Sequence, residues 1–310
     1  KDFKESIFGD KEYEFVLYWN NRNIRRKQPL DVIFAFDKFV EALAPEHRDK
    51  VCLVMHTQPV EEHGTDLPRS IAECCSSETN VIFAPNKYSE EQLNYLYNIA
   101  DVTINIASNE GFGMATAESV MAGTPIIANV TGGMQDQMRF EFEDGTWIDF
   151  DADFPSNHRG TIKKHGEWAF PVYPTSRSIV GSPPTPYIYD DRCESEDAAE
   201  QIMAVYSLSK EERKDKGLKG REWAINEAGF TGETQGKRVI EAFDELFSTY
   251  FIWPTVTKLM SDILGKSFLD AQFYSIYSTN HPQQKQYQFL FYLKSCIYNL
   301  KQYLLFENIA

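Results

Sequence analysis

Two glutamates lie eight positions apart across a glycine-rich turn in the stretch ASNEGFGMATAESVMAGTPIIANVTGG, residues 107–133. Gly111 and Gly113 allow a ligand to approach the backbone, and the N–H groups that begin the following helix form an anion site suited to phosphate. A carboxylate repels phosphate, so we expect Glu110 to accept hydrogen bonds from hydroxyls on a neutral part of the ligand. Glu118, two helical turns further on, is placed to bind a second hydroxyl pair, such as that of a ribose. The pattern predicts a nucleotide-sugar ligand.

A cluster of cations precedes this turn in the sequence. The stretch NNRNIRRKQPLDV, residues 20–32, contains Arg22, Arg25, Arg26 and Lys27 in a chain whose formal net charge is −15. Arginine offers a planar fork to phosphate oxygens, and lysine offers a compact charge. An isolated run of this kind is usually a solvated basic loop. Its predicted position beside a ligand crevice favours a phosphate site instead.

Alternating strands and helices are expected to position these residues. Strands are predicted at 14–19, 51–56, 80–84, 101–107 and 125–130, with helices between them that include 66–75 and 90–100. Short strands that alternate with longer helices favour an α/β fold with a doubly wound parallel sheet, Rossmann-like in type. Ligands bind such sheets at the carboxyl ends of the strands. Arg22, His56 and Glu110 should therefore face one crevice.

The pattern changes after residue 133. Residues 134–195 are rich in proline, glycine and aromatic side chains and lack clear periodicity, which predicts a long irregular insertion. We hypothesise that it lines an acceptor or sugar subsite through Trp168, Tyr173, Arg177 and Tyr187. Helices are predicted at 195–207, 210–228 and 233–249. The expected domains are a nucleotide-sugar-binding domain, residues 1–249, and an aromatic-rich helical extension, residues 250–310, which packs on that domain or mediates self-association.

Composition limits the classes of function. A net charge of −15 over 310 residues argues against general nucleic-acid binding, which requires a basic face. The five cysteines are scattered and form no C-x-x-C pair, so we expect reduced thiols in a cytoplasmic protein. No apolar run approaches the ~20 residues needed to cross a bilayer. The chain begins with Lys and shows no signal-peptide pattern, which is consistent with a fragment.

The motif around the two glutamates resembles the donor-binding signature of retaining GT-B glycosyltransferases, especially glycosyltransferase family four. The matching residues are Glu110, Gly111, Phe112, Gly113, Glu118, Ala122, Gly123, Pro125, Gly132 and Gly133. Arg22 and Lys27 match the Arg-x4-Lys element of that family, and YNIADV resembles the segment before its fourth strand. The resemblance covers about residues 13–135, with a weaker similarity in the helices at 195–249.

The resemblance implies a role for each of these residues. Arg22 and Lys27 would hold the donor diphosphate and stabilise its charge as the glycosidic bond breaks. Glu110 would bind sugar hydroxyls, and Glu118 would bind the ribose. The backbone of Gly111, Phe112 and Gly113, with Gly132 and Gly133, would complete the donor site, and the base would lie near residues 81–85. Neither a metal nor another cofactor is implied, and transfer would retain the anomeric configuration.

The sequence also departs from the family pattern. Asn21 stands where glycine usually precedes the arginine, and GMATAES replaces a stretch that usually contains leucine and proline. The half of a GT-B enzyme that binds the acceptor, which can be a glycan, lipid or protein, is missing, so we expect it upstream in a longer protein or in another chain.

Three other functions compete with this interpretation. A non-catalytic nucleotide-sugar scaffold or sensor would also keep the donor site. A metal-dependent GT-A transferase would use Asp149, Asp151 and Asp153, whose spacing can hold a divalent cation. A glycosidase would need two carboxylates ~5 to 9 Å apart, but it would leave the cationic loop unexplained.

Overall fold

The computed structural model describes residues 2–76, 78–148 and 162–249 of the chain. The chain divides into two compact units, Lys1–Thr234 and Gln235–Ala310. The predicted extension at 250–310 lies outside the described residues, so the domain boundary at residue 249 stays a prediction.

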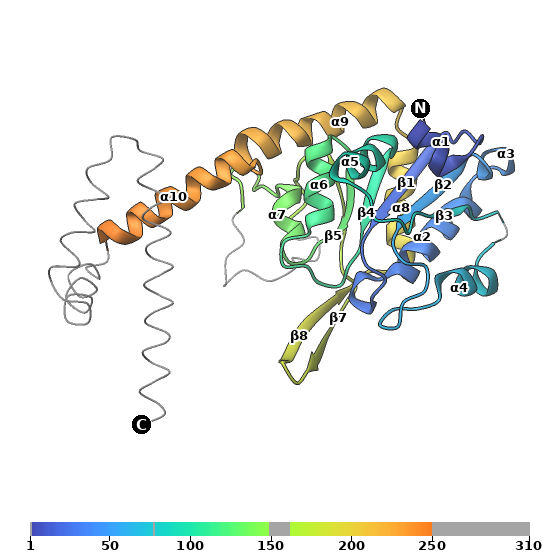
Figure 1. The fold of residues 1–310 in the computed structure, drawn as a ribbon, viewed down its shortest axis with the longest axis horizontal. Coiled ribbons are helices and arrows are strands. Elements are labelled where there is room, and N and C mark those ends of the chain that lie inside the picture. Colours follow the sequence, from blue (N-terminus) through green and yellow to red (C-terminus); the bar gives the residue numbers. More distant parts are fainter. Residues whose placement is uncertain (1, 77, 149–161, 250–310) are drawn as a thin grey trace. The chain divides into compact units, whose positions relative to one another are not determined.

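A six-stranded parallel sheet forms the centre of the first unit (Figure 1). Its strands are β1 Phe15–Asn20, β2 Val51–His56, β3 Val81–Phe83, β4 Val102–Asn105, β5 Ile126–Asn129 and β6 Ala169–Val172. They lie in the order β3-β2-β1-β4-β5-β6, and every neighbouring pair is parallel. This arrangement confirms the predicted α/β fold class. The chain reverses its direction of winding between β1 and β4, where α/β sheets of this kind bind ligands.

Helices cover the sheet on both faces because the strand side chains alternate between them. One face of β1 carries Phe15, Leu17 and Trp19, which belong to a buried cluster with residues of α2 and α8. The other face carries Val16 and Tyr18, which belong to a second cluster with residues of α1 and α5. The helical elements of this unit are α1 Asp2–Phe8, η1 Arg25–Lys27, α2 Pro29–Ala42, α3 Pro45–Arg48, α4 Leu67–Cys74, α5 Glu90–Ile99, α6 Met114–Ala122, α7 Met134–Met138, α8 Ser195–Tyr206, α9 Lys210–Trp223 and the π-turn Ala224–Ala228.

Local sequence signals explain where several helices begin. Ser89 and Gln92 form a capping box at α5, and Ser209 and Glu212 form another at α9. Pro29 occupies the first turn of α2, where its missing N–H costs nothing. The helix predicted at 233–249 is present as α10, Gly232–Thr249.

The segment 134–195 is not simply an irregular insertion. It contains α7 and the edge strand β6, which pairs with β5 from Ala169 to Val172. Strands β7 Ser176–Ser182 and β8 Thr185–Arg192 form an antiparallel hairpin (Figure 1). A four-residue strand that contains Pro171 gives almost no periodic signal, and proline is tolerated there because β6 lies at the sheet edge.

Trp168 is a core residue, contrary to the hypothesis that it lines a subsite. Its side chain is buried, and its ring stacks on Trp223 with 4.8 Å between centroids. The indole N–H donates to the Gln137 carbonyl at 3.0 Å. Both the apolar body and the polar tip of the side chain are therefore satisfied inside the domain.

Candidate functional site

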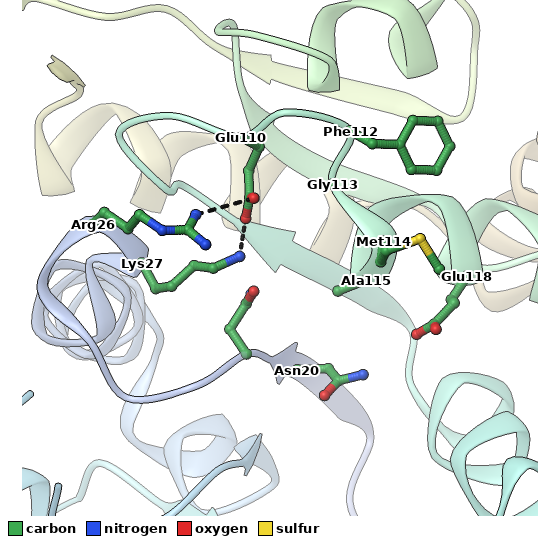
Figure 2. Close-up of a pocket in the computed structure, with 10 residues that line it drawn as sticks. Asn20, Arg26, Lys27, Glu110, Phe112, Gly113, Met114, Ala115 and Glu118 are labelled. Carbon is green, nitrogen blue, oxygen red and sulfur yellow. Dashed lines mark hydrogen bonds and ion pairs between the residues drawn. The ribbon is translucent and has the colours of Figure 1, made fainter. Parts of the chain in front are cut away.

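A cavity of about 430 Å³ opens at the point where the sheet changes its direction of winding. Its volume lies within the range of ~300–1,000 Å³ that is typical of small-molecule sites. The residues that line it come from the end of β1, from η1, from the loop after β4 and from α6 (Figure 2): Asn20, Asn21, Arg26, Lys27, Glu110, Phe112, Gly113, Met114, Ala115 and Glu118. The cavity thus brings together the cationic loop and the two glutamates that the sequence singled out.

Glu110 bridges two cations at one side of the cavity (Figure 2). Lys27 Nζ donates to Glu110 Oε1, and Arg26 Nη1 donates to Glu110 Oε2 at 3.1 Å. The side chains of Lys27 and Glu110 are only 12% and 8% exposed. Burial is the largest influence on the pKa of Lys27 and lowers it, while the Glu110 carboxylate opposes that shift. Two cations against one carboxylate leave one positive charge in excess at this side.

Backbone contacts hold the cationic loop against the turn after β4. The Ser108 N–H donates to the Arg26 carbonyl at 2.8 Å, and Arg26 Nη1 also donates to the Asn109 carbonyl at 3.2 Å. The 3-10 turn η1 places Arg26 and Lys27 in succession beside this loop. The position of the cations therefore follows from the same contacts that shape the Glu110 turn.

Helix α6 supplies backbone donors to the cavity. Gly113 precedes the helix with φ +86°, a left-handed conformation that glycine adopts without strain, and no side chain caps the first turn. The N–H groups of a first turn have no partner within their own helix. Met114 and Ala115 belong to this turn and line the cavity. The helix start can thus bind an anion opposite the cations.

Gly132 and Gly133 support the turn from behind. A Cβ at Gly132 would lie 2.1 Å from the Glu110 carbonyl oxygen, and a Cβ at Gly133 would lie 2.3 Å from that of Gly111. The Gly133 N–H donates to the Glu110 carbonyl at 3.0 Å. Neither glycine is among the residues that line the cavity, so their predicted contact with a donor stays a prediction, whereas their close packing is observed.

Glu118 lies on α6 at the other side of the cavity and is held from below. Tyr97 Oη donates to Glu118 Oε2 at 2.6 Å, and Asn20 Nδ2 donates to Tyr97 Oη at 2.8 Å. The sequence analysis identified neither Tyr97, which contacts Glu118, nor Asn20, which contacts Tyr97. Asn20 was detectable as a polar residue at the end of an apolar strand, but nothing in the helical pattern marked Tyr97.

Arg22 is not among the residues that line the cavity. Its guanidinium pairs with Glu61 at 2.8 Å, and its side chain is 59% exposed. Asn23 explains this position, because its buried amide donates to the carbonyls of Gln58, Pro59 and Thr65 and ties the loop after β1 to the loop after β2. Arg26 rather than Arg22 pairs with Glu110, and the predicted contact of Arg22 with the donor diphosphate stays a prediction.

Part of the chain is similar in sequence to known glycosyl transferases. Residues 1–154 match the family model described as "Glycosyl transferases group 1". This match supports the resemblance to glycosyltransferases that the motifs predict, while membership of family four stays a prediction. A curated relative, the D-inositol 3-phosphate glycosyltransferase of Thermomonospora curvata, is 43% identical over 53 residues, which cover 17% of this chain and 12% of that protein.

Solved glycosyltransferase structures share the fold. A glycosyltransferase from Rickettsia africae superposes with a TM-score of 0.54 at 15% identity, covering 80% of this chain and 52% of that one. Sucrose-phosphate synthase from Thermosynechococcus elongatus superposes with a TM-score of 0.52 at 18% identity, and the match covers 81% of this chain and 50% of that one. Anabaena HepE in complex with UDP and glucose superposes with a TM-score of 0.51 at 14% identity, and the match covers 78% of this chain and 51% of that one. The chain thus spans about half the length of these structures.

Tyr173, Arg177 and Tyr187, the other candidates in the segment 134–195, are not among the residues that line the cavity. Arg177 pairs with Asp191 at 2.8 Å and lies over the Tyr189 ring, and Tyr187 is 74% exposed on the hairpin. Tyr173 donates to the Ile162 carbonyl. Residues 81–85, where the base was expected, are not among the lining residues.

Within residues 2–76, 78–148 and 162–249, no three His, Cys, Asp or Glu side chains are grouped to hold a metal ion. Asp149, Asp151 and Asp153 lie outside these ranges. No helix within them is long and apolar enough to span a membrane.

Proposed function

We propose that this chain is the donor-binding half of a retaining glycosyltransferase that moves a sugar from a nucleoside diphosphate donor to an acceptor. The observation that carries the proposal is the cavity between β1 and β4, which has cations on one side and the uncapped first turn of α6 and Glu118 on the other. The segment that builds it lies within residues 1–154, which match the group 1 glycosyl transferases.

The charges of the cavity suit a diphosphate. Lys27 and Arg26 carry an excess of positive charge near Glu110, and the first turn of α6 adds N–H donors. Pairing with two cations neutralises the Glu110 carboxylate, which reduces its repulsion of a nearby phosphate. Glu110 then accepts hydrogen bonds from sugar hydroxyls, and Glu118 accepts them from the ribose.

These groups would act on the leaving diphosphate. As the bond between the anomeric carbon and the phosphate oxygen breaks, negative charge develops on that oxygen, and fixed cations and helix dipoles stabilise it. The acceptor hydroxyl attacks the same face of the sugar, and its proton passes to the departing phosphate oxygen. Retention then requires neither a side-chain nucleophile nor a metal, and rate acceleration comes from positioning and electrostatic stabilisation.

The comparisons favour this class of donor. The Anabaena HepE structure contains UDP and glucose, and the Thermosynechococcus elongatus relative is a sucrose-phosphate synthase. Because this chain spans about half the length of such structures, we propose that an acceptor-binding half in a longer protein or another chain completes the enzyme.

Calorimetric titration of the full chain with UDP, GDP and ADP, with and without EDTA, tests the proposal. We expect one nucleotide to bind with micromolar affinity irrespective of EDTA, and Lys27→Met to weaken it at least ~10-fold, since it removes a buried charged contact. Arg25→Met is the matched control, because Arg25 lies in the same loop but does not line the cavity. Absence of binding by all three nucleotides would contradict the proposal.

A further inference from the structure

A chain of hydrogen bonds runs beneath the cavity from Glu118 to β2. Tyr97 Oη donates to Glu118 Oε2 at 2.6 Å and accepts from Asn20 Nδ2 at 2.8 Å. Asn20 Oδ1 lies 2.9 Å from His56 Nδ1. The register of β1 and β2 pairs Asn20 with His56, so the sheet itself aligns the last two members.

Tyr97 is fixed more firmly than the residue it contacts. Its side chain is 2% exposed, and its ring meets Tyr18 edge-on with 5.1 Å between centroids. Its carbonyl accepts from Thr124 Oγ1 at 2.7 Å, which ties the end of α5 to the start of β5. Glu118 is half-buried and faces the cavity. The hydroxyl of Tyr97 therefore provides a rigid reference point for a carboxylate that borders open space.

The hydroxyl also has a defined direction. Asn20 donates to it, so its own proton is available for Glu118. Burial and the neighbouring Glu118 charge both raise the pKa of Tyr97, which keeps the hydroxyl protonated at physiological pH. One lone pair of Glu118 Oε2 is thus occupied by Tyr97, and the carboxylate lines the cavity.

We propose that Tyr97 is a positioning residue that orients Glu118 to accept the two ribose hydroxyls of the donor, with Asn20 holding Tyr97 in the donating orientation. This inference rests on the proposed function and adds to it a residue that sets the preference for ribose. A carboxylate held by one oxygen presents the other to a neighbouring diol, and preorganisation of this kind lowers the entropic cost of binding. The preference for ribose over its 2′,3′-dideoxy form then depends on Tyr97, which does not contact the ligand.

Tyr97→Phe tests this role when affinities are compared for two forms of the ligand. The probes are the nucleotide that binds best among UDP, GDP and ADP, and its 2′,3′-dideoxy analogue. We expect Tyr97→Phe to weaken binding of the ribonucleotide by about three- to tenfold, the net worth of a typical hydrogen bond, and to leave the affinity for the dideoxy analogue unchanged. Glu118→Gln should reduce the same preference.

Tyr18→Phe provides a matched control. Tyr18 is fully buried against Tyr97, and its hydroxyl has no hydrogen-bond partner among the described residues. This variant should keep the full preference for ribose, and thermal unfolding of both variants reports any loss of fold. Equal weakening of both ligands by Tyr97→Phe, or no weakening of either, would overturn the positioning role alone. Failure of the unaltered chain to bind any of the three nucleotides would overturn the proposed function and this inference together.

Discussion

Glu110 shows how the fold brings opposite charges together at the edge of the cavity. A buried carboxylate and a buried ammonium are both costly to desolvate, and each offsets the cost of the other when they are paired. The sequence predicted that Glu110, Lys27 and Glu118 share one site, because a glycine turn and a basic loop each follow a strand. It named Arg22 rather than Arg26 as the second cation of the site. The contacts of Asn23 that hold the Arg22 loop against the loop after β2 leave no signal in the sequence pattern.

Arg22 provides a test at the residue scale. If Arg22 joins the diphosphate when a ligand binds, it must leave Glu61, so Glu61→Gln should raise nucleotide affinity about two- to threefold, as expected for an exposed ion pair. Arg22→Met should lower the affinity by a similar factor. Glu78→Gln is the charge-matched control, because Glu78 pairs with Arg48 and does not line the cavity. Unchanged affinity in the first two variants would remove Arg22 from the donor site.

At the scale of elements, the turn after β4 is shaped by segments that are distant in sequence. Gly132 and Gly133 pack against its backbone, and Asp190 of β8 accepts from Ser108 Oγ at 2.9 Å and from Asn109 Nδ2 at 3.2 Å. The sequence predicted the five strands between residues 14 and 130 and the helices that alternate with them, because the hydrophobic periods of strands and helices are clear there. It missed β6 and the hairpin, because short strands with proline and glycine depend on pairing partners rather than on local pattern.

The support that Gly132 gives to the turn can be measured. Gly132 has φ +50°, and an added Cβ would overlap the Glu110 carbonyl, so Gly132→Ala should destabilise the protein by more than ~2 kcal/mol. Gly111→Ala is the matched control within the turn, because no atom lies within 4 Å of its added Cβ. Denaturant unfolding followed by circular dichroism reports both variants. Equal stability of the two would show that the turn does not depend on this close approach.

At the scale of the whole molecule, Trp168 belongs to the core rather than lining the cavity. The aromatic side chains in 134–195 were expected to mark a ligand subsite, yet Trp168 joins Trp223 in the core and packs against Gly220 of α9. Composition alone cannot distinguish core packing from ligand binding, because tryptophan is common in both. The role depends on what the ring contacts in the folded protein.

Trp168→Ala separates core packing from ligand binding. The substitution should destabilise the protein by about 3–5 kcal/mol, as large-to-small changes of buried aromatic residues do. At a temperature where the variant remains folded, nucleotide affinity should stay within twofold of the unaltered chain. Tyr187→Ala, at an exposed position on the hairpin, should change neither quantity. A selective loss of binding in Trp168→Ala without loss of stability would restore the ligand-site hypothesis.

A crystal structure of the chain with its bound nucleoside diphosphate tests the central claim most directly. We predict that the diphosphate lies between Lys27 and the first turn of α6, with the ribose hydroxyls on Glu118. Binding in another place would contradict the claim, for example in the smaller cavity of about 170 Å³ that Arg25 and Arg192 line.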